Sequence, residues 1–401
     1  MNVLLLCGVF ARENEKEVMQ HSRGGADLAA NNFQRKLIAG FREIGCEFSV
    51  LSAPFLGAWP MGSDIPVFRG FTEACGDCTY VPFNNVWGIR NLSRAASLKK
   101  AIRPFIEADD PEKLIVVYCP HTPFLEAAVY ARKQDPRIRI CLYVPDLPQY
   151  MNLNANRSRL YDIAKKYDVA AMMKLMEQVD SYVLLAEPMK DLLPVGDKPY
   201  RVIEGIVTRE QIEQAQTLTG RESDGTLIHV VYTGKLNEQF GVRNLVDAFC
   251  MIEDPRYRLV LCGRGDCEDY IAQRCKTDPR ILYLGQVTPE EAHAWMGRAG
   301  VLVNPRSASG EYTKYSFPSK NIEYLLSGRP VVACFLPGMP DAYRQFLTTM
   351  DDNSPESLRD AIISAAGRGN SAAGAIAYLV RKCEAAGICR EILKISGYEH
   401  E

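Results

Sequence analysis

The sequence predicts an α/β protein made of two domains, each built on a parallel sheet. At 401 residues the chain is too long for one typical hydrophobic core. Its apolar content of 47% and charged content of 24% are those of a soluble globular protein. Continuous apolar runs alternate with longer mixed segments, and this alternation pauses once and then restarts.

In the first half, continuous β-rich runs are typical of strands buried on both faces. They read NVLLLCGVF, EFSVLSAPF, KLIVVYC, IRICLYVPDL and SYVLLA. The segments between them, such as 26–44 and 92–107, are long enough for crossover helices. Parallel strands joined by right-handed crossovers are therefore expected.

The second half repeats this pattern after the polar stretch QAQTLTGRESDGT. Its strand runs read LIHVVYTG, YRLVLCG, RILYLGQ, AGVLVNP and PVVACFL, with VRNLVDAFCMI and PEEAHAWMGRA as helical segments between them. We place the boundary near Tyr200, which gives domains of residues 1–199 and 200–401. Residues 374–396 predict one or two amphipathic helices, which either complete the second domain or pack back on the first.

Composition limits the cellular compartment and the classes of partner that are expected for this protein. The formal net charge of -2 argues against a nucleic-acid binder driven by overall charge. The first residues lack a basic start, and no apolar run approaches the roughly 20 residues that span a bilayer, so a cytoplasmic protein is expected. The 13 cysteines are scattered and expected to be reduced. Cys75 and Cys78 form one C-x-x-C without a second pair, so structural zinc is disfavoured.

Ligands of open α/β sheets bind beyond the carboxyl ends of the strands, and unusual residues follow several predicted strands. They are Gly8, Gly24, Gly25, His121 and Asp146 in the first half, and Gly234, Lys235, Gly263, Gly285, Pro305 and Arg306 in the second. No G-x-G-x-x-G follows the first strand, which argues against a dinucleotide cofactor.

Three of these side chains allow more than one interpretation. His121 either points into a cleft between the domains or caps the next helix. Lys235 either offers a positive charge to a diphosphate leaving group or is a solvated turn residue. Asp146 fits an acid, a group that positions an acceptor, or a helix cap.

The stretch from Pro305 to Val332 predicts a loop that leads into a short helix. Pro318 suits the first helical position, and the helix should end at Gly328. The start of such a helix suits a phosphate, and Glu323 could accept a hydrogen bond from a sugar hydroxyl. The alternative is an ordinary helix in which Glu323 pairs with Lys320.

The segment 90–103, RNLSRAASLKKAIR, places several cations on a predicted helix, among them Arg90 and Arg94. It follows two aromatic residues, Phe83 and Trp87. Basic helices beside aromatics can dock anionic lipid headgroups or a lipid-linked diphosphate. The alternative is a solvated charged face.

Taken together, the motifs resemble those of the nucleotide-sugar glycosyltransferases of the GT-B fold, in particular family 4. The resemblance rests on YTGKLNEQFGVRNLVDAF, LVLCGRGDCEDYI with ILYLGQV, and KYSFPSKNIEYLLSGRPVV, with RGGADLAANNFQRKL in the first half. The third motif is similar to the version in bacterial capsule and exopolysaccharide enzymes.

The resemblance implies two Rossmann-like domains facing a cleft, with the donor in the second and the acceptor in the first. It implies retaining transfer from a nucleotide diphosphate sugar, with uridine as the expected base. The acceptor would be a glycan or a polyprenyl-diphosphate-linked acceptor, and no metal or other cofactor is expected. An association with the inner membrane face is a further expectation.

The resemblance also assigns residues. Glu323 would hold the ribose, Lys235 the diphosphate, and His121 would occupy the place of the cleft histidine. Other donor contacts would come from the helix start, the glycine turns and the base site: Tyr315, Ser316, Phe317, Pro318, Ser319, Lys320, Gly24, Gly25, Gly234, Gly263, Gly285 and Val287. Arg90, Arg94 and Asp146 are the candidates for the acceptor or its lipid.

The sequence departs from the family pattern at two positions. Phe240 stands where members carry a second lysine, and Arg243 and Lys320 are candidates to replace it. Tyr315 stands where the first acid of an acidic pair is usual. A nucleotide-sugar epimerase of the same architecture and a non-catalytic nucleotide-sugar-binding protein are the alternative functions.

Overall fold

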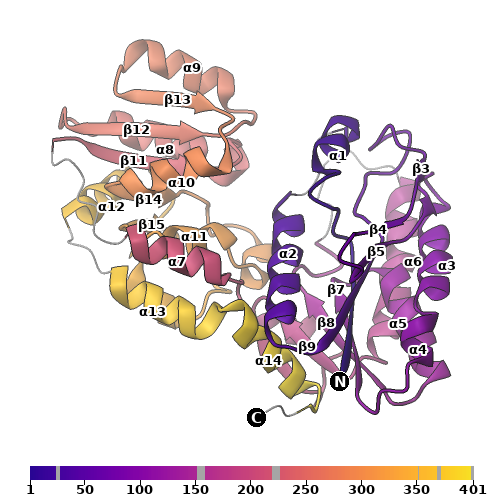
Figure 1. The fold of residues 1–401 in the computed structure, drawn as a ribbon. Coiled ribbons are helices and arrows are strands. Elements are labelled where there is room, and N and C mark those ends of the chain that lie inside the picture. The colour runs from indigo at the N-terminus through magenta and orange to yellow at the C-terminus, as the bar shows by residue number, and fades with distance from the viewer. Residues whose placement is uncertain (24–27, 151–158, 219–225, 351, 368–371, 399–401) are drawn as a thin grey trace. The chain divides into compact units, whose positions relative to one another are not determined.

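The computed structural model describes residues 1–23, 28–150, 159–218, 226–350, 352–367 and 372–398 (Figure 1). The chain forms two compact units. The first consists of Met1–Thr208 with Cys383–Glu401, and the second of Arg209–Lys382. The boundary expected near Tyr200 falls within the first unit, because β10 (Tyr200–Val202) pairs with β9 (Ser181–Leu184) at the edge of the first sheet.

The first unit is organised on an eight-stranded sheet in the order β10-β9-β8-β7-β1-β2-β5-β4. Its other strands are β1 (Asn2–Cys7), β2 (Glu47–Ser52), β4 (Phe71–Thr72), β5 (Cys78–Tyr80), β7 (Lys113–Tyr118) and β8 (Ile138–Val144). All neighbours pair in parallel except β4 and β5, which are antiparallel. β1, β7 and β9 are buried along their whole length, as their apolar runs predict.

Helices cover both faces of this sheet (Figure 1). They are α1 (Glu15–His21), α2 (Leu28–Glu43), α3 (Arg90–Ala101), α4 (Arg103–Glu107), α5 (Thr122–Gln134), α6 (Arg159–Met176), the 3-10 helix η1 (Glu187–Leu192) and α14 (Ala385–Ile395). The antiparallel pair β3 (Val67–Phe68) and β6 (Phe83–Asn84), which the sequence did not predict, forms a separate ribbon.

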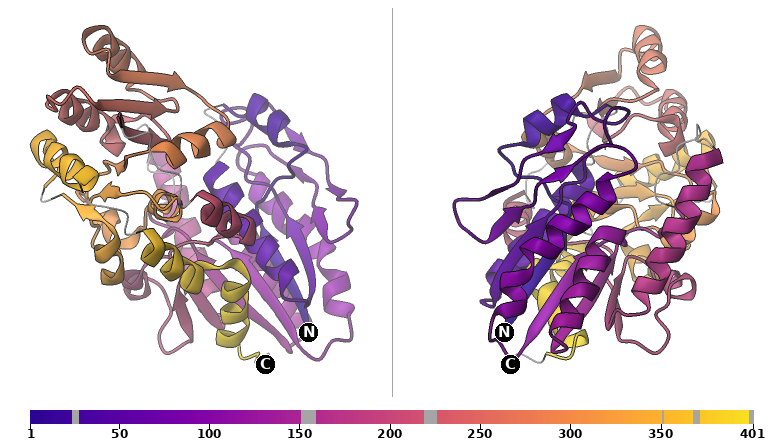
Figure 2. Two further views of the ribbon diagram at one scale, coloured as in Figure 1. Left: turned by 60° about the vertical axis from the view of Figure 1, so that its left-hand side comes forward. Right: turned by 90° about the vertical axis from the view of Figure 1, so that its right-hand side faces the viewer.

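The C-terminal helix α14 belongs to the first unit. In Figures 1 and 2 it lies in yellow beside the indigo α2. The two helices approach closely, because a Cβ added at Gly40 of α2 would lie 2.5 Å from the carbonyl oxygen of Ala385. The chain therefore returns to its first unit after completing the second.

The second unit is organised on a six-stranded, fully parallel sheet in the order β13-β12-β11-β14-β15-β16. Its strands are β11 (Ile228–Thr233), β12 (Tyr257–Cys262), β13 (Ile281–Gly285), β14 (Val301–Asn304), β15 (Val331–Ala333) and β16 (Thr348–Thr349). The predicted α/β class with two parallel-sheet halves is confirmed.

The helices of the second unit pack on both faces of its sheet. They are α7 (Arg209–Leu218), η2 (Glu238–Phe240), α8 (Val242–Cys250), α9 (Glu268–Thr277), α10 (Pro289–Arg298), η3 (Glu311–Tyr315), α11 (Ser319–Leu326), η4 (Asp341–Phe346), α12 (Pro355–Gly367) and α13 (Ala372–Cys383). Apolar residues of α8 and α12, among them Leu245 and Ile362, form one core with strand residues such as Val230.

Candidate functional site

Three glycine turns lie at the carboxyl edge of the second sheet. Gly234 follows β11, Gly263 follows β12 and Gly285 ends β13. The backbone N–H of Gly263 donates to the carbonyl of Gly285 at 2.7 Å, and that of Gly234 donates to Cys262 at 2.8 Å. A Cβ on Gly263, where φ is +136°, would lie 1.8 Å from the Gly234 oxygen. Bare backbone therefore forms this edge, because no side chain fits between the turns.

Lys320 lies against the first of these turns. A Cβ on Gly234 would lie 2.9 Å from Cε of Lys320, and the ammonium is 3.5 Å from the hydroxyl of Thr233. Burial lowers the pKa of Lys320, and the charge of Glu323 opposes that shift. The structure thus brings Gly234, Lys320 and Glu323 together at the end of β11.

Two buried side chains hold α11 in this position. The hydroxyl of Tyr324 accepts a hydrogen bond from the backbone N–H of Thr233 at 3.0 Å. Because Tyr324 follows Lys320 by one helical turn, both point from the same face of α11. The amide of Asn304, at the end of β14, donates to Asn321 at 2.7 Å. The sequence did not single out these residues, since each partner is distant along the chain.

The loop before α11 contributes a buried polar atom. The Ser316 hydroxyl oxygen is inaccessible to solvent and has no hydrogen-bond partner within the described part of the chain. The ring of Phe317 packs on Tyr343 with centroids 4.9 Å apart, whereas Ser319 is exposed. Tyr315 ends η3. Buried polar groups of this kind are normally satisfied, so the hydroxyl of Ser316 is a candidate ligand contact.

Pro318 does not occupy the first helical position that the sequence predicted. It is the N-cap residue of α11, with φ −71° and ψ 104°. The extended ψ leaves the backbone of Pro318 outside the helix, so α11 begins at Ser319. The helix ends at Leu326, before the left-handed Gly328.

The other two basic candidates, Lys235 and Arg243, differ in the contacts that their side chains make. Lys235 is exposed, while its backbone oxygen accepts a hydrogen bond from the Tyr232 hydroxyl at 2.9 Å. The guanidinium of Arg243 pairs with Glu238 at 3.4 Å and lies 4.1 Å from the centroid of the Tyr270 ring. Of the two candidates to replace the lysine missing at Phe240, only Lys320 therefore contacts the turn at Gly234.

Three predicted residues complete the donor candidates. Val287 is partly exposed and follows Gly285 at the end of β13. Gly24 and Gly25, in the first unit, lie outside the described residues.

His121 lies at the carboxyl edge of the first sheet, where it is the N-cap residue of α5. Its side chain makes no capping hydrogen bond, and Nδ1 is buried with no partner among the described residues. The ring contacts Phe55 and Phe124, with centroids 5.6 and 4.7 Å away. Burial, aided by the charges of Arg94 and Arg90, lowers the pKa of His121 well below its usual value. The imidazole is therefore neutral at physiological pH.

Arg94 does not belong to a solvated face, because its residue is only 1% exposed. It donates to the carbonyl of Pro54 at 2.6 Å, and its guanidinium lies 4.4 Å from the centroid of the Phe83 ring. Burial and the charge of Arg90 lower the pKa of Arg94 to about 9, so it stays protonated at neutral pH. Asp146 follows β8 as an exposed residue.

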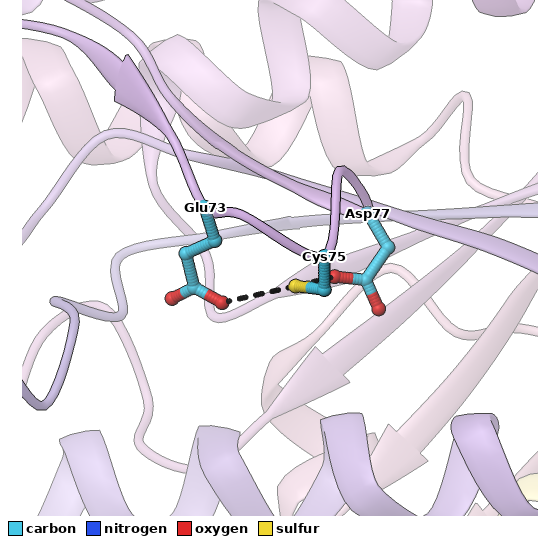
Figure 3. Close-up of side chains that lie close together, drawn as sticks. All are labelled: Glu73, Cys75 and Asp77. Atoms are coloured by element: carbon cyan, nitrogen blue, oxygen red, sulfur yellow. Dashed lines mark hydrogen bonds between the residues drawn. The ribbon is translucent and has the colours of Figure 1, made fainter.

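Glu73, Cys75 and Asp77 gather three potential metal ligands on the turn between β4 and β5 (Figure 3). The thiol of Cys75 lies 2.9 Å from Asp77 and 3.6 Å from Glu73. Asp77 also pairs with Arg42 at 2.8 Å, and burial raises the pKa of Cys78 to about 12. The C-x-x-C thus has one exposed and one buried thiol, an arrangement that does not present both sulfurs to one ion.

Solved structures identify the fold to which this arrangement belongs. Sucrose-phosphate synthase from Thermosynechococcus elongatus is 15% identical, with a TM-score of 0.63 over 98% of both chains. An α,α-trehalose-phosphate synthase from Burkholderia xenovorans, in complex with glucose-6-phosphate, is 10% identical, with a TM-score of 0.65 over 99% of this chain and 100% of the other. Anabaena Alr3699/HepE, in complex with UDP and glucose, is 15% identical, with a TM-score of 0.56 over 98% of both.

These likenesses establish a GT-B fold, two Rossmann-like domains on parallel sheets. Residues 228–367, which contain the glycine turns and α11, match the family described as Glycosyl transferases group 1. No curated protein matches the sequence. Among the described residues, no helix is long and apolar enough to cross a membrane.

Proposed function

We propose that the protein is a retaining, family 4 glycosyltransferase that uses a nucleotide diphosphate sugar, with uridine as the base. The acceptor is a glycan or a polyprenyl-diphosphate-linked glycan, made for capsule, exopolysaccharide or O-antigen. Support comes from the group 1 family match over residues 228–367 and from the shared fold of a protein solved with UDP and glucose. No metal or other cofactor is assigned to the reaction.

The observation that carries this proposal is the cation at the end of β11. Lys320 lies in the first turn of α11 and is held against Gly234, and the buried hydroxyl of Ser316 in the preceding loop has no partner among the described residues. A diphosphate needs positive charge and N–H donors, and a helix start beside a lysine supplies both. Lys235 adds an exposed cation from the same turn.

In the proposed reaction the bond between the anomeric carbon and the diphosphate oxygen breaks, and its electron pair stays on the diphosphate. The acceptor oxygen bonds to the anomeric carbon on the same face of the sugar, and its proton passes to the departing diphosphate. Negative charge accumulates on the departing diphosphate. Lys235, Lys320 and the start of α11 stabilise that charge, and Glu323 holds the ribose. His121 stays neutral, so Nδ1 can hydrogen-bond a sugar hydroxyl.

The decisive test is transfer by the Lys235→Ala variant. Removing one electrostatic contact to the leaving group should lower the rate by about two to three powers of ten. Glu323→Ala should weaken uridine diphosphate binding, measured by calorimetry. A transfer rate within a fewfold of wild type would exclude the role of Lys235. An isomerised sugar formed from donor alone would indicate an epimerase.

We also propose that the enzyme acts in the cytoplasm. All of its cysteines are free, including exposed Cys75, as in a reducing compartment. Labelling of Cys75 by a thiol reagent on protein purified without reductant would agree with this, whereas a disulfide to another molecule at that position would contradict it.

A further inference from the structure

Arg306 is a cation at the carboxyl edge of the second sheet that has no role in the proposed chemistry. It follows Pro305 directly after β14 and is half-buried. Its Nε is inaccessible to solvent and has no hydrogen-bond partner within the described ranges, where the guanidinium also forms no ion pair. A desolvated charged donor costs free energy until a group of opposite charge satisfies it.

The unsatisfied buried side chains of the second unit lie in one loop. Among the described residues of that unit, only Nε of Arg306 and the hydroxyl of Ser316 are buried side-chain N or O atoms without a hydrogen-bond partner. Both belong to residues 305–318, which connect β14 to α11. Since buried polar groups are normally satisfied, this coincidence points to a polar ligand at the loop.

Contacts within the loop hold the surroundings of Arg306 in place. The hydroxyl of Thr313, a residue only 1% exposed, lies 3.0 and 2.7 Å from the carbonyl oxygens of Ala308 and Gly310. Gly310 has a φ of +104°, and a Cβ there would lie 2.7 Å from the ring of Tyr312. The guanidinium carbon of Arg306 is 5.5 Å from the centroid of that ring. An aromatic ring fixed by the loop therefore supports the cation on one side.

The strand before Arg306 lies beside β11 in the second sheet (Figure 1). β14 and β11 pair in parallel with Val231 opposite Leu302, and two residues further they end at Thr233 and Asn304. Neighbouring strands are about 4.8 Å apart, and the chain leaves both at the same level of the edge. The backbone of Arg306 therefore lies close to the turn that follows β11.

Two further observations connect Arg306 with that turn. A Cβ added at Gly241, where φ is +78°, would lie 2.1 Å from the carbonyl oxygen of Pro305, so the end of the turn packs on the residue before Arg306. Burial raises the pKa of Tyr232, and the charge of Arg306 acts against this rise. The hydroxyl of Tyr232 donates to the backbone oxygen of Lys235 at 2.9 Å. Arg306 is therefore within electrostatic reach of the turn that carries Lys235.

We propose that Arg306 is a further donor-binding residue whose guanidinium holds oxygens of the diphosphate from the side of β14. This inference rests on the proposed function, since its ligand is the nucleotide diphosphate sugar. A guanidinium presents parallel N–H donors that match phosphate oxygens in a bidentate arrangement. When the bond to the anomeric carbon breaks, its electron pair stays on the diphosphate, which also receives the proton of the acceptor hydroxyl. A cation that keeps its own proton stabilises the charge that develops there.

Calorimetry with the full chain tests this role. Arg306→Met removes the charge and the N–H donors but keeps an apolar stem, and it should weaken uridine diphosphate binding about 30-fold, the ratio expected for a hydrogen bond to a charged group. Displacement of uridine diphosphate by inorganic pyrophosphate should weaken by the same factor, whereas uridine affinity should not change. Arg306→Lys should restore only part of the affinity, because lysine is a point charge. Uridine diphosphate affinity of Arg306→Met within about threefold of wild type would overturn the proposal.

Arg298→Met is the matched control. The guanidinium of Arg298 is 5.8 Å from the centroid of the Trp295 ring, but it lies in the last turn of α10, before β14 begins. This variant loses the same kind of cation–π contact at the opposite end of the strand, so it should bind uridine diphosphate as wild type does. The urea midpoint of ligand-free Arg306→Met should not fall, because the substitution removes a buried donor without a partner. A lower midpoint with equal losses of uridine and uridine diphosphate affinity would make Arg306 structural and overturn the proposal.

Binding and transfer, measured on the same proteins, separate this inference from the proposed function. Wild type that transfers sugar, with unchanged uridine diphosphate affinity in Arg306→Met, would overturn the role of Arg306 alone. Wild type that transfers no sugar, with the 30-fold loss in Arg306→Met, would support that role and contradict the transferase. A loss confined to a donor with a uronic acid, with uridine diphosphate affinity unchanged, would assign the guanidinium to a sugar carboxylate and overturn the proposal.

Discussion

The carboxyl edges of the two sheets differ in whether backbone or side chains line them. In the second unit the edge is backbone, with Gly263 pressed against Gly234 and one lysine above the turn. In the first unit the edge is filled by side chains, with His121 between two phenylalanine rings and near a buried arginine. An edge of bare backbone lets a phosphate approach closely whatever sugar it carries, whereas side chains discriminate between acceptors. Under the proposed function, the second unit would fix the donor chemistry and the first unit would fix the choice of acceptor.

The two edges also treat charge differently. Burial lowers the pKa of Lys320 in the second unit, so an anionic ligand would relieve a cost that the free protein carries. In the first unit the cations Arg94 and Arg90 act on His121, whose pKa they help to lower. An anion would therefore be stabilised at the edge of the second sheet, whereas the edge of the first sheet keeps the imidazole of His121 neutral.

The largest effect is expected where the backbone edge is tightest. Gly263→Ala would place a Cβ 1.8 Å from the Gly234 oxygen at a φ of +136°. Strain and overlap together should lower the free energy of unfolding by about 3 kcal/mol or more. Urea unfolding monitored by circular dichroism measures this loss.

Gly285→Ala is the matched control for that measurement. Gly285 also has a positive φ, +66°, but an added Cβ would meet no atom within 4 Å. Only backbone strain remains, so the loss should be about 1 kcal/mol. Equal losses in the two variants would show that the turns at Gly234 and Gly263 are not in close contact.

The next effect concerns the lysine of the second unit. Lys320→Met should weaken uridine diphosphate binding about 30-fold, from about 2 kcal/mol for a hydrogen bond to a charged group. The same change should raise the stability of the ligand-free protein by about 1 kcal/mol, because it removes a desolvated cation. Calorimetry and urea unfolding measure the two effects separately.

The stability gain of Lys320→Met depends on pH. The pKa of Lys320 is lower in the folded than in the unfolded protein, so the unfolded chain binds more protons between the two values. The wild type therefore gains stability as pH rises through that window, and the advantage of the variant should disappear near the ordinary lysine pKa of about 10.4. A pH-independent advantage would contradict the desolvation of Lys320.

The sequence predicted the architecture because long apolar runs leave little freedom. Strands such as Lys113–Tyr118 and Val301–Asn304 coincide with their predicted runs, since only a doubly covered parallel sheet buries them. It failed for β3 and β6, strands of two residues whose pairing depends on the fold around them. The sequence also did not decide which domain α14 packs on, because periodicity reveals the apolar face of a helix but not the surface that covers it.

The candidate site was predicted in part. The positions of the motifs assigned Lys320 and Glu323 to the site. They did not decide whether Lys320 or Arg243 replaces the lysine that is absent at Phe240. The anchors Tyr324 and Asn304 were missed, because hydrogen bonds to Thr233 and Asn321 join segments far apart in sequence. The sequence predicted Arg94 only as one of several cations on a basic helix. Its burial results from the packing of α3 on the β-ribbon at Phe83.

A smaller effect is expected for the imidazole of the first unit. The pKa of His121 is depressed in the folded protein, so below about pH 6.5 the unfolded chain binds the extra proton. Stability should fall with decreasing pH by up to about 1.4 kcal/mol per pH unit from this group. His121→Phe should remove that part of the slope in a series of urea unfolding curves measured at decreasing pH. Identical slopes for wild type and His121→Phe would show that His121 is protonated in the fold.

The smallest effect separates the two candidate cations of the second unit. Arg243 is engaged by Glu238 at 3.4 Å and by the ring of Tyr270 at 4.1 Å, away from Gly234. A partly exposed ion pair and a cation–π contact contribute about 1 kcal/mol, so Arg243→Ala should lower stability by that much at most. Uridine diphosphate affinity should stay within about threefold of wild type, since no phosphate contact is lost. If Arg243→Ala weakened that affinity as strongly as Lys320→Met, the cation that replaces the lysine absent at Phe240 would be Arg243, and the role of the contact between Lys320 and Gly234 would be structural.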